Sequence, residues 1–491
     1  MRSVRSRIWR HKWAVALICL TLFRLVIAAF LPLTPDESYY RLWALLPAAG
    51  YFDHPPMVAL FIRAGMMLLG DNACGVRFMG PVSAAAGTVL LARSAEGWVY
   101  FRGGSPQQAC RAALCAACLL NGTVALGVGT ILMTPDTPLL FFITVLIWSV
   151  TRLFATGQGR WWLVAGLSAG LSFDSKYTAV LPVAGLVIWL FVTQSGRQWL
   201  RSVWPWAGGL FAAVLISPVV WWNMTHHWVS FIRQGGRTGD WQPAKMLTYS
   251  GELAGGQVGL ASPLIFLFFA YGAWLLIRQK DALSRLWVFM LAVPLCVFVQ
   301  HALGARVQAN WPVVLYPLFC LASTLPVWRW WKAAAATGGA LTLCILLQAF
   351  FSPFRLSPHA DVTLRQMGGW REWGQHVAKN VPADAPLIAD DYSVAAELAF
   401  YLPRSRVVIG VDPRWSVFGL PQAQCGEGYL VRSHRRHDQP DPAYFSVLSS
   451  LPDIIRSRRG VIADTYSVYK VKLNCEGGAL ARDSFVLPVS E

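Results

Sequence analysis

Long apolar runs alternate with short polar segments over roughly the first 350 residues of the chain. A helix rises about 1.5 Å per residue, so about 20 apolar residues cross a hydrocarbon core of roughly 30 Å. Because lipid offers no partner to exposed backbone groups, the pattern predicts an α-helical polytopic membrane protein. We expect about 11 transmembrane helices, at residues 14–31, 76–95, 109–131, 138–154, 161–174, 178–194, 204–222, 258–277, 284–300, 311–325 and 333–350.

The pattern changes after the last predicted span, where charges, prolines and short alternating runs replace the long apolar segments. Two short runs favour strands and two segments favour helices. In that order they are Arg406–Val411, Val468–Leu473, Gly369–Asn380 and Val394–Tyr401. We therefore predict a transmembrane domain over residues 1–352 and a small C-terminal α/β domain over residues 353–491.

Two of the predicted loops are long, and both should lie on the same side of the membrane as the C-terminal domain. The first covers about residues 32–75 and contains the apolar stretch Met57–Leu69. That stretch is too short to span, so we expect it to lie along the interface or dip into it. The second loop covers about residues 223–257 and is rich in Gly, Trp and Arg.

The composition agrees with a membrane protein. The chain is 55% hydrophobic and 14% charged, with a mean hydropathy of +0.44, whereas a soluble protein of 491 residues needs more charge to cover its surface. The net charge of +17 does not indicate nucleic acid, because many Arg and Lys residues lie between apolar segments. We therefore expect the membrane as a partner and no nucleic acid.

The same basic residues orient the chain. An odd number of spans puts these residues in inside loops: Arg102, Arg160, Arg197, Arg201, Arg278, Lys280, Arg329 and Lys332. We therefore predict a bacterial inner-membrane protein with a cytoplasmic N-terminus and a periplasmic C-terminal domain. In that compartment Cys425 and Cys475 could form a disulfide, and the sequence leaves open whether they are bridged.

Acidic residues gather where the first outer loop begins. Asp36 and Glu37 follow the first span, and Asp136 lies in a second Thr-Pro-Asp triplet that the topology puts at the same membrane face. A partly desolvated carboxylate can remove the proton of a hydroxyl that accepts a sugar. The alternative is a solvated loop that opens with a Pro-Asp turn.

Basic residues at the same face could hold a phosphate. Lys176 lies between two apolar segments, and Arg306 precedes the triplet Asn310–Pro312. Both could bind a phosphate leaving group by charge-assisted hydrogen bonds, although a lysine at a helix end can also snorkel to water. Asp53 and His54 could bind a divalent metal or a phosphate, but a metal site usually needs three or four ligands. A rigid Pro-Pro turn with incidental polar neighbours is the alternative there.

The order of several motifs resembles that of the GT-C superfamily of glycosyltransferases, which are membrane proteins that use lipid-linked sugars. The closer resemblance is to the bacterial branch related to protein O-mannosyltransferases and to the lipid A aminoarabinose transferase, the dolichyl-phosphate-mannose-protein mannosyltransferase-like family. It covers roughly residues 10–350. The motifs that carry it are Asp36-Glu37, Gly50–Pro56, Gly70–Arg77, Thr134–Pro138, Ser175–Thr178 and Asn310–Pro312.

The resemblance implies a polyprenyl-phosphate donor that carries one sugar, with transfer at the outer face and inversion at the anomeric carbon. It assigns catalysis to Asp36, as the base or as a group that orients the acceptor. Glu37 and Asp136 are then expected to shape the site. The residues expected to stabilise the leaving phosphate are Lys176, Arg306 and His54. No Gly-rich nucleotide loop follows a predicted strand, which also favours a lipid-borne donor.

One departure from the family pattern concerns the first loop. The aminoarabinose transferase has Glu-Lys-Pro where this chain has Asp53-His54-Pro55. Because histidine is a weaker and pH-dependent phosphate partner, the departure leaves the sugar and any divalent-metal cofactor open.

The acceptor that we predict is lipid A or the lipopolysaccharide core, with protein as the alternative. Two hypotheses of other classes remain. A transporter of lipid-linked sugars should show inverted repeats or broken helices in corresponding halves, and we find no such pairing in the sequence. A non-catalytic binding protein should keep its function when Asp36 is replaced by alanine.

Overall fold

The computed structural model describes residues 2–235, 241–326, 329–474 and 483–490. The chain forms two compact units, and each combines separate stretches of sequence. The first, here called the helical unit, comprises Met1–Arg24, Asp53–Val58 and Gly80–Leu343. The second, here called the mixed unit, comprises Leu25–Phe52, Ala59–Met79 and Cys344–Glu491. The boundary that we predicted at residue 352 stays a prediction.

Apolar helices dominate the chain, as predicted. Among the described residues, 6 helices are long and apolar enough to cross a membrane, or up to 8 if each of 2 bent helix pairs counts as one span. The six are Lys12–Phe30 in α1 (Arg2–Phe30), Ala73–Phe101, which joins α4 (Ala73–Arg77) to α5 (Met79–Phe101), α8 (Asp136–Thr156), α12 (Val203–Thr225), α16 (Ala282–Ala302) and α18 (Trp331–Phe351). The structure thus confirms a helical membrane protein. Length and hydropathy support fewer spans than the predicted 11, so the orientation drawn from an odd number stays a prediction.

Three predicted spans form helices that are too short to pass the same test. Residues 109–131 are divided into α6 (Pro106–Gly122) and α7 (Val124–Gly129). The break occurs because Thr123 has extended backbone angles and its side chain caps the second helix by accepting from the Leu126 N–H. The other two are α9 (Trp161–Phe173) and, for residues 311–325, the turn η4 (Trp311–Leu315) with α17 (Tyr316–Ala322).

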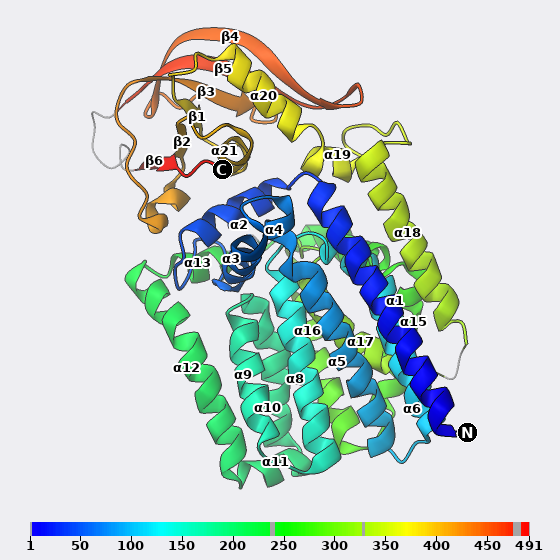
Figure 1. Ribbon diagram of the computed structural model, residues 1–491. Coiled ribbons are helices and arrows are strands. Elements are labelled where there is room, and N and C mark those ends of the chain that lie inside the picture. Colours follow the sequence, from blue (N-terminus) through cyan, green and yellow to red (C-terminus); the bar gives the residue numbers. More distant parts are fainter. Residues whose placement is uncertain (1, 236–240, 327–328, 475–482, 491) are drawn as a thin grey trace. The chain divides into compact units, whose positions relative to one another are not determined.

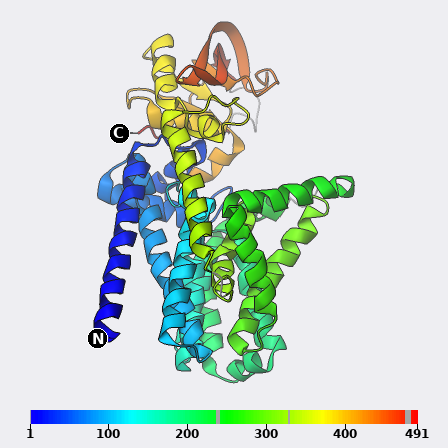
Figure 2. The ribbon, with the colours of Figure 1, turned by 90° about the vertical axis from the view of Figure 1, so that its right-hand side faces the viewer.

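The region around Ser262 also differs from the prediction. A continuous span over residues 258–277 is wrong, because α14 (Met246–Ala261) and α15 (Pro263–Ile277) meet at a bend of 108°. Ser262 has a φ of 74°, and Pro263 starts the new helix. The bend is visible between the green helices in Figure 2. The predicted loop at 223–257 is therefore partly helical, with α13 (Val229–Gly235) and most of α14.

Close helix packing in the helical unit depends on small residues. Gly166 of α9 faces Gly208 of α12, and a Cβ atom on Gly166 would lie 2.0 Å from the Gly208 carbonyl oxygen. Helices in lipid approach most closely where side chains are small, because packing rather than hydrophobic burial drives their association. The two glycines therefore explain how α9 and α12 lie against each other (Figure 1).

The C-terminal part of the mixed unit is an α/β domain, as predicted. Its six-stranded sheet has the order β4-β5-β3-β1-β2-β6. The parallel strands β1, β2 and β3 form the centre, and β4, β5 and β6 add to it in antiparallel pairing. The long β4 and β5 lie side by side in Figure 1. The bounds are β1 (Leu387–Ala389), β2 (Val408–Val411), β3 (Glu427–Ser433), β4 (Phe445–Arg458), β5 (Val461–Leu473), β6 (Ser484–Leu487), α19 (Val362–Met367), α20 (Trp370–Asn380) and α21 (Tyr392–Tyr401).

The predicted first outer loop is largely helical, with α2 (Pro35–Leu45), α3 (Met57–Leu69) and α4. In the mixed unit α2 packs against α21 of the C-terminal domain. Aromatic rings contribute to the contact, where Tyr39 of α2 meets Tyr392 of α21 edge to face at 4.9 Å between ring centroids. Beside it, Trp43 stacks on Tyr51 at 4.4 Å. The acidic segment at the start of α2 therefore rests on a buried aromatic cluster rather than on a loose loop.

The cysteine prediction is tested in part. Cys425 is disulfide-bonded, and Cys475 lies outside the described residues.

Candidate active site

The start of α2 follows directly from the local sequence Thr34-Pro35-Asp36-Glu37. Thr34 is the N-cap, and its hydroxyl accepts from the Glu37 N–H at 3.3 Å. In return the Glu37 carboxylate accepts from the Thr34 N–H at 3.0 Å, which completes a capping box. Pro35 occupies the first turn, where its missing N–H costs nothing. The four residues thus turn the chain sharply into the helix that carries both predicted acids.

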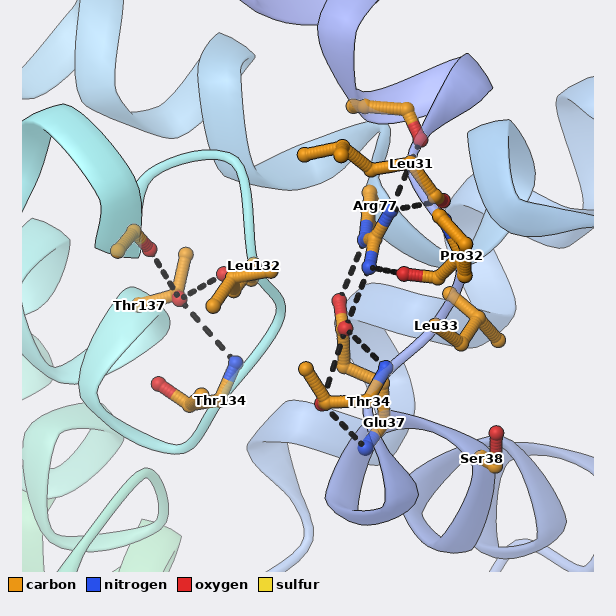
Figure 3. Close-up of polar contacts among 12 residues, drawn as sticks. Leu31, Pro32, Leu33, Thr34, Glu37, Ser38, Arg77, Leu132, Thr134 and Thr137 are labelled. Atoms are coloured by element: carbon orange, nitrogen blue, oxygen red, sulfur yellow. Dashed lines mark hydrogen bonds and ion pairs between the residues drawn. The ribbon is translucent and has the colours of Figure 1, made fainter. Parts of the chain in front are cut away.

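Glu37 is buried and has a fixed partner. Arg77, the last residue of α4, donates to both Glu37 carboxylate oxygens at 2.6 Å, and both side chains are 0% exposed. Arg77 also donates to the backbone carbonyls of Ala28, Leu31 and Pro32 at 3.1, 2.7 and 2.8 Å (Figure 3). Arg77 thereby joins the end of α1, the start of α2 and α4. The burial of Glu37 argues for a structural role, and its expected part in shaping the active site stays a prediction.

Asp36 differs from its neighbour in exposure. Its side chain is exposed, on the first turn of α2, where the helix dipole favours a negative charge. The hydroxyl of Tyr392, the first residue of α21, donates to Asp36 Oδ1 at 3.1 Å. Of the two adjacent carboxylates, only Asp36 is therefore accessible to a substrate. Tyr392 was not predicted from the sequence, because nothing in the local sequence marks it as a site residue.

A second polar cluster lies in the helical unit. Lys176 contacts both carboxylate oxygens of Asp136, at 2.7 and 2.8 Å, and Asn310 donates to the same carboxylate at 2.8 Å. The three come from separate elements: Asp136 starts α8, Lys176 precedes the turn η1 (Tyr177–Ala179), and Asn310 precedes η4. Three motifs that are far apart in the sequence thus meet at one carboxylate. Lys176 is buried, so the ion pair compensates a charge that would be costly alone.

The turn before α8 has the same Thr-Pro-Asp sequence as the start of α2, but its N-cap is Pro135, and among the described residues no side chain caps the helix. The Thr134 N–H donates to the Thr137 hydroxyl at 3.3 Å, and that hydroxyl donates to the Leu132 carbonyl at 3.3 Å (Figure 3). These contacts hold the Thr-Pro-Asp turn in place, so Asp136 is presented by a rigid segment.

Asp53 and His54 belong to the helical unit, whereas Asp36 and Glu37 belong to the mixed unit. The Asp53 carboxylate lies 3.7 Å from the Arg233 guanidinium, and Gln234 donates to the Asp53 carbonyl at 2.6 Å. In the part of the chain that the structure describes, no group of three or more His, Cys, Asp or Glu side chains could hold a metal ion. A metal at Asp53 and His54 stays a prediction.

Arg306 is placed on the surface of the helical unit. Its side chain is 74% exposed and pairs with Glu252 of α14 at 2.8 Å. Because both partners are exposed, the pair contributes little to stability. A phosphate could displace Glu252 there at small cost, so a role for Arg306 in binding the donor also stays a prediction.

Comparisons with known proteins bear on the class to which this chain is similar. Residues 53–222 match the family described as dolichyl-phosphate-mannose-protein mannosyltransferase. The lipid A galacturonosyltransferase RgtD from Rhizobium johnstonii is 24% identical, with 93% of this chain and 97% of that protein covered.

The fold is similar to that of ArnT from Cupriavidus metallidurans. The crystal structure with undecaprenyl phosphate bound has a TM-score of 0.60 at 14% identity, covering 93% of this chain and 98% of ArnT. The apo structure has a TM-score of 0.61 at 13% identity, covering 94% of this chain and 98% of ArnT. The fold, the family match and the curated relative together define the class. The chain is a membrane-bound glycosyltransferase, as the motifs predicted, and it is similar to proteins of the GT-C superfamily in sequence and in fold.

Proposed function

We propose that this enzyme moves a single sugar from a polyprenyl phosphate to lipid A or the lipopolysaccharide core, with inversion at the anomeric carbon. The observation that carries the proposal is the accessible Asp36 carboxylate on a helix whose other acid is locked away. The relative that is named for a lipid A substrate supports the acceptor, and the bound undecaprenyl phosphate of ArnT supports the donor.

In the proposed reaction, an acceptor oxygen attacks the anomeric carbon and the bond from that carbon to the phosphate oxygen breaks. The polyprenyl phosphate leaves with the bonding electron pair. If the acceptor is a hydroxyl, Asp36 takes its proton. If the acceptor is a lipid A phosphate, which is already ionised, Asp36 instead orients it.

Lys176 is the donor-phosphate ligand that we propose first, with Arg306 and His54 in support. Because Lys176 is paired with Asp136 and buried, its ammonium is held in one position before the donor arrives. A fixed cation stabilises the charge that develops on the leaving phosphate without reorganising during the reaction.

We also propose that the enzyme resides in the bacterial inner membrane, with the C-terminal domain in the periplasm. The disulfide of Cys425 supports this orientation, because disulfides persist in oxidising compartments such as the periplasm.

The test is sugar transfer by purified protein. Wild type and the Asp36→Asn variant would receive radiolabelled polyprenyl-phosphate sugars with a lipopolysaccharide extract, or with unfolded protein as the alternative acceptor. Loss of a general base lowers turnover by roughly 10²–10⁴-fold. A matched control is Asp384→Asn, which changes another exposed aspartate of the mixed unit and should leave transfer unchanged.

The outcomes separate the hypotheses. Label in lipid A that is lost only in Asp36→Asn supports the proposal, whereas label in protein alone would replace the acceptor. Equal transfer by both variants would remove Asp36 from catalysis. No transfer by wild type with any donor would reject the proposed reaction and favour a transporter or a binding protein.

A further inference from the structure

The contact between Asp36 and Tyr392 joins the candidate base to the C-terminal domain. Both residues lie in the mixed unit, although they are 356 positions apart in the sequence. The phenol donates to one carboxylate oxygen, at 3.1 Å. A donor on one oxygen restricts rotation of a carboxylate and favours its ionised form.

A cation polarises the phenol that makes this contact. The guanidinium carbon of Arg414 lies 3.8 Å from the centroid of the Tyr392 ring, which is within cation–π range. Asp412 fixes Arg414 through an ion pair of 3.1 Å, and the Arg414 side chain is only 12% exposed. A cation on the ring face withdraws electron density from the phenol, so the hydroxyl becomes a stronger hydrogen-bond donor.

The segment before Tyr392 is held in place by the contacts of Asp390. The Asp390 carboxylate pairs with Arg432 at 3.0 Å and with Arg436 at 3.2 Å, and Arg436 also donates to the Asp390 carbonyl at 2.8 Å. Asp391 then caps α21 by accepting from the N–H groups of residues 393 and 394. The phenol is therefore carried by backbone that is held on both sides.

A further contact keeps α21 in register with α2. The Ser38 hydroxyl donates to the buried carboxyl group of Glu397 at 3.2 Å. Because Ser38 lies two residues after Asp36, this contact fixes the position of α21 along the axis of α2. Several independent contacts therefore position the Tyr392 hydroxyl at Asp36. An accidental contact between two surface side chains would not require this support.

We propose that Tyr392 is a positioning residue of the C-terminal domain that orients the Asp36 carboxylate for sugar transfer, with Arg414 tuning the phenol. The inference rests on the proposed function and deepens it. It gives the C-terminal domain a part in the chemistry.

The test compares Tyr392→Phe with wild type in the full-length enzyme. The change keeps the ring and its contact with Arg414 but removes the donor. We expect kcat to fall about tenfold, which corresponds to about 1.4 kcal/mol, with a smaller change in KM for the donor lipid. The acidic limb of the rate profile should move to higher pH, because the ionised carboxylate loses a hydrogen bond.

Two further variants separate positioning from simple structural damage. Tyr444→Phe removes a similar bond, 3.2 Å from the phenol to Asp483 in the same domain, and should leave the pH profile unchanged. Arg414→Gln keeps the Tyr392 hydroxyl and should shift the profile in the same direction by a smaller amount. In an Asp36→Asn background, Tyr392→Phe should lower residual activity no further, since the two residues act as one unit.

Each outcome has a distinct meaning. If wild type transfers sugar and Tyr392→Phe keeps both kcat and the pH profile, the positioning role is overturned while the proposed function stands. If Tyr392→Phe folds poorly, an unchanged pH profile in Arg414→Gln overturns it equally. If wild type transfers no sugar, the proposed function fails, and the positioning role fails with it.

Discussion

The Glu37–Arg77 pair provides a sharp test of how the first outer segment is held. Replacing Arg77 with methionine keeps much of the side-chain volume but removes the charge and the donors. The arginine makes two hydrogen bonds to the carboxylate and three to backbone carbonyls, all in buried surroundings. We expect the loss of these contacts to destabilise the whole mixed unit, because they join α1, α2 and α4.

The magnitude follows from burial. Breaking a buried ion pair from one side leaves an uncompensated charge and costs about 3–5 kcal/mol. Each carbonyl that loses its donor adds a further cost of about 1 kcal/mol unless water reaches it. We therefore expect Arg77→Met to lower the free energy of unfolding by about 6–8 kcal/mol, or by about 3–5 kcal/mol if water reaches all three carbonyls.

The measurement is urea-dependent proteolysis of the mixed unit in detergent, which reports the free energy of opening that unit. The control is Lys470→Met in the same unit, which breaks a pair with Glu427 at side-chain exposures of 36% and 59%. That pair should contribute about 0–1 kcal/mol. Replacing Glu37 together with Arg77 by methionine should cost less than Arg77→Met alone, because no buried charge remains. An Arg77→Met variant as stable as Lys470→Met would refute this reasoning.

Two other predictions concern the positive charge of Lys176 and the proton on the Glu397 carboxyl group. Lys176→Met should reduce kcat/KM for the donor about a hundredfold, because the site loses a preorganised cation beside Asp136, and donor titration measures it. Unchanged kcat/KM with normal folding would contradict the assignment. Burial raises the pKa of Glu397 well above its usual value, so the folded unit keeps a proton that the unfolded chain releases. Stability should therefore fall as pH rises from about 4.5 through the folded pKa, and Glu397→Gln should abolish this slope in unfolding measured at about pH 5 and about pH 8. An equal slope in both proteins would show that another group is responsible.

Much of the fold could be predicted because its signals are local. Long apolar runs must become helices in lipid, and the alternating pattern of the tail favours strands, so the helical part and the α/β domain were both predicted correctly. The predictions failed where one residue interrupts a run. Thr123 divides one apolar segment and Ser262 bends another, and hydropathy averaged over a window does not register either break.

Part of the local structure around the candidate site also depends on short-range signals. The sequence Thr-Pro-Asp-Glu contains the whole capping box of α2, so the place of Asp36 at a helix start was within reach of local analysis. The difference in burial between Asp36 and Glu37 could not be predicted from local sequence. It depends on Arg77, which is 40 residues away and buries one carboxylate while its neighbour stays exposed.

The sequence by itself determined that the chain lies in a membrane, that acidic residues follow its first apolar helix, and that an α/β domain ends the chain. These properties follow from hydropathy, charge and periodicity, which act over a few turns of chain. Only the tertiary structure decided which side chains meet. Asn310 reaches Asp136 across 174 positions and Tyr392 reaches Asp36 across 356, and no short-range rule connects residues at such separations.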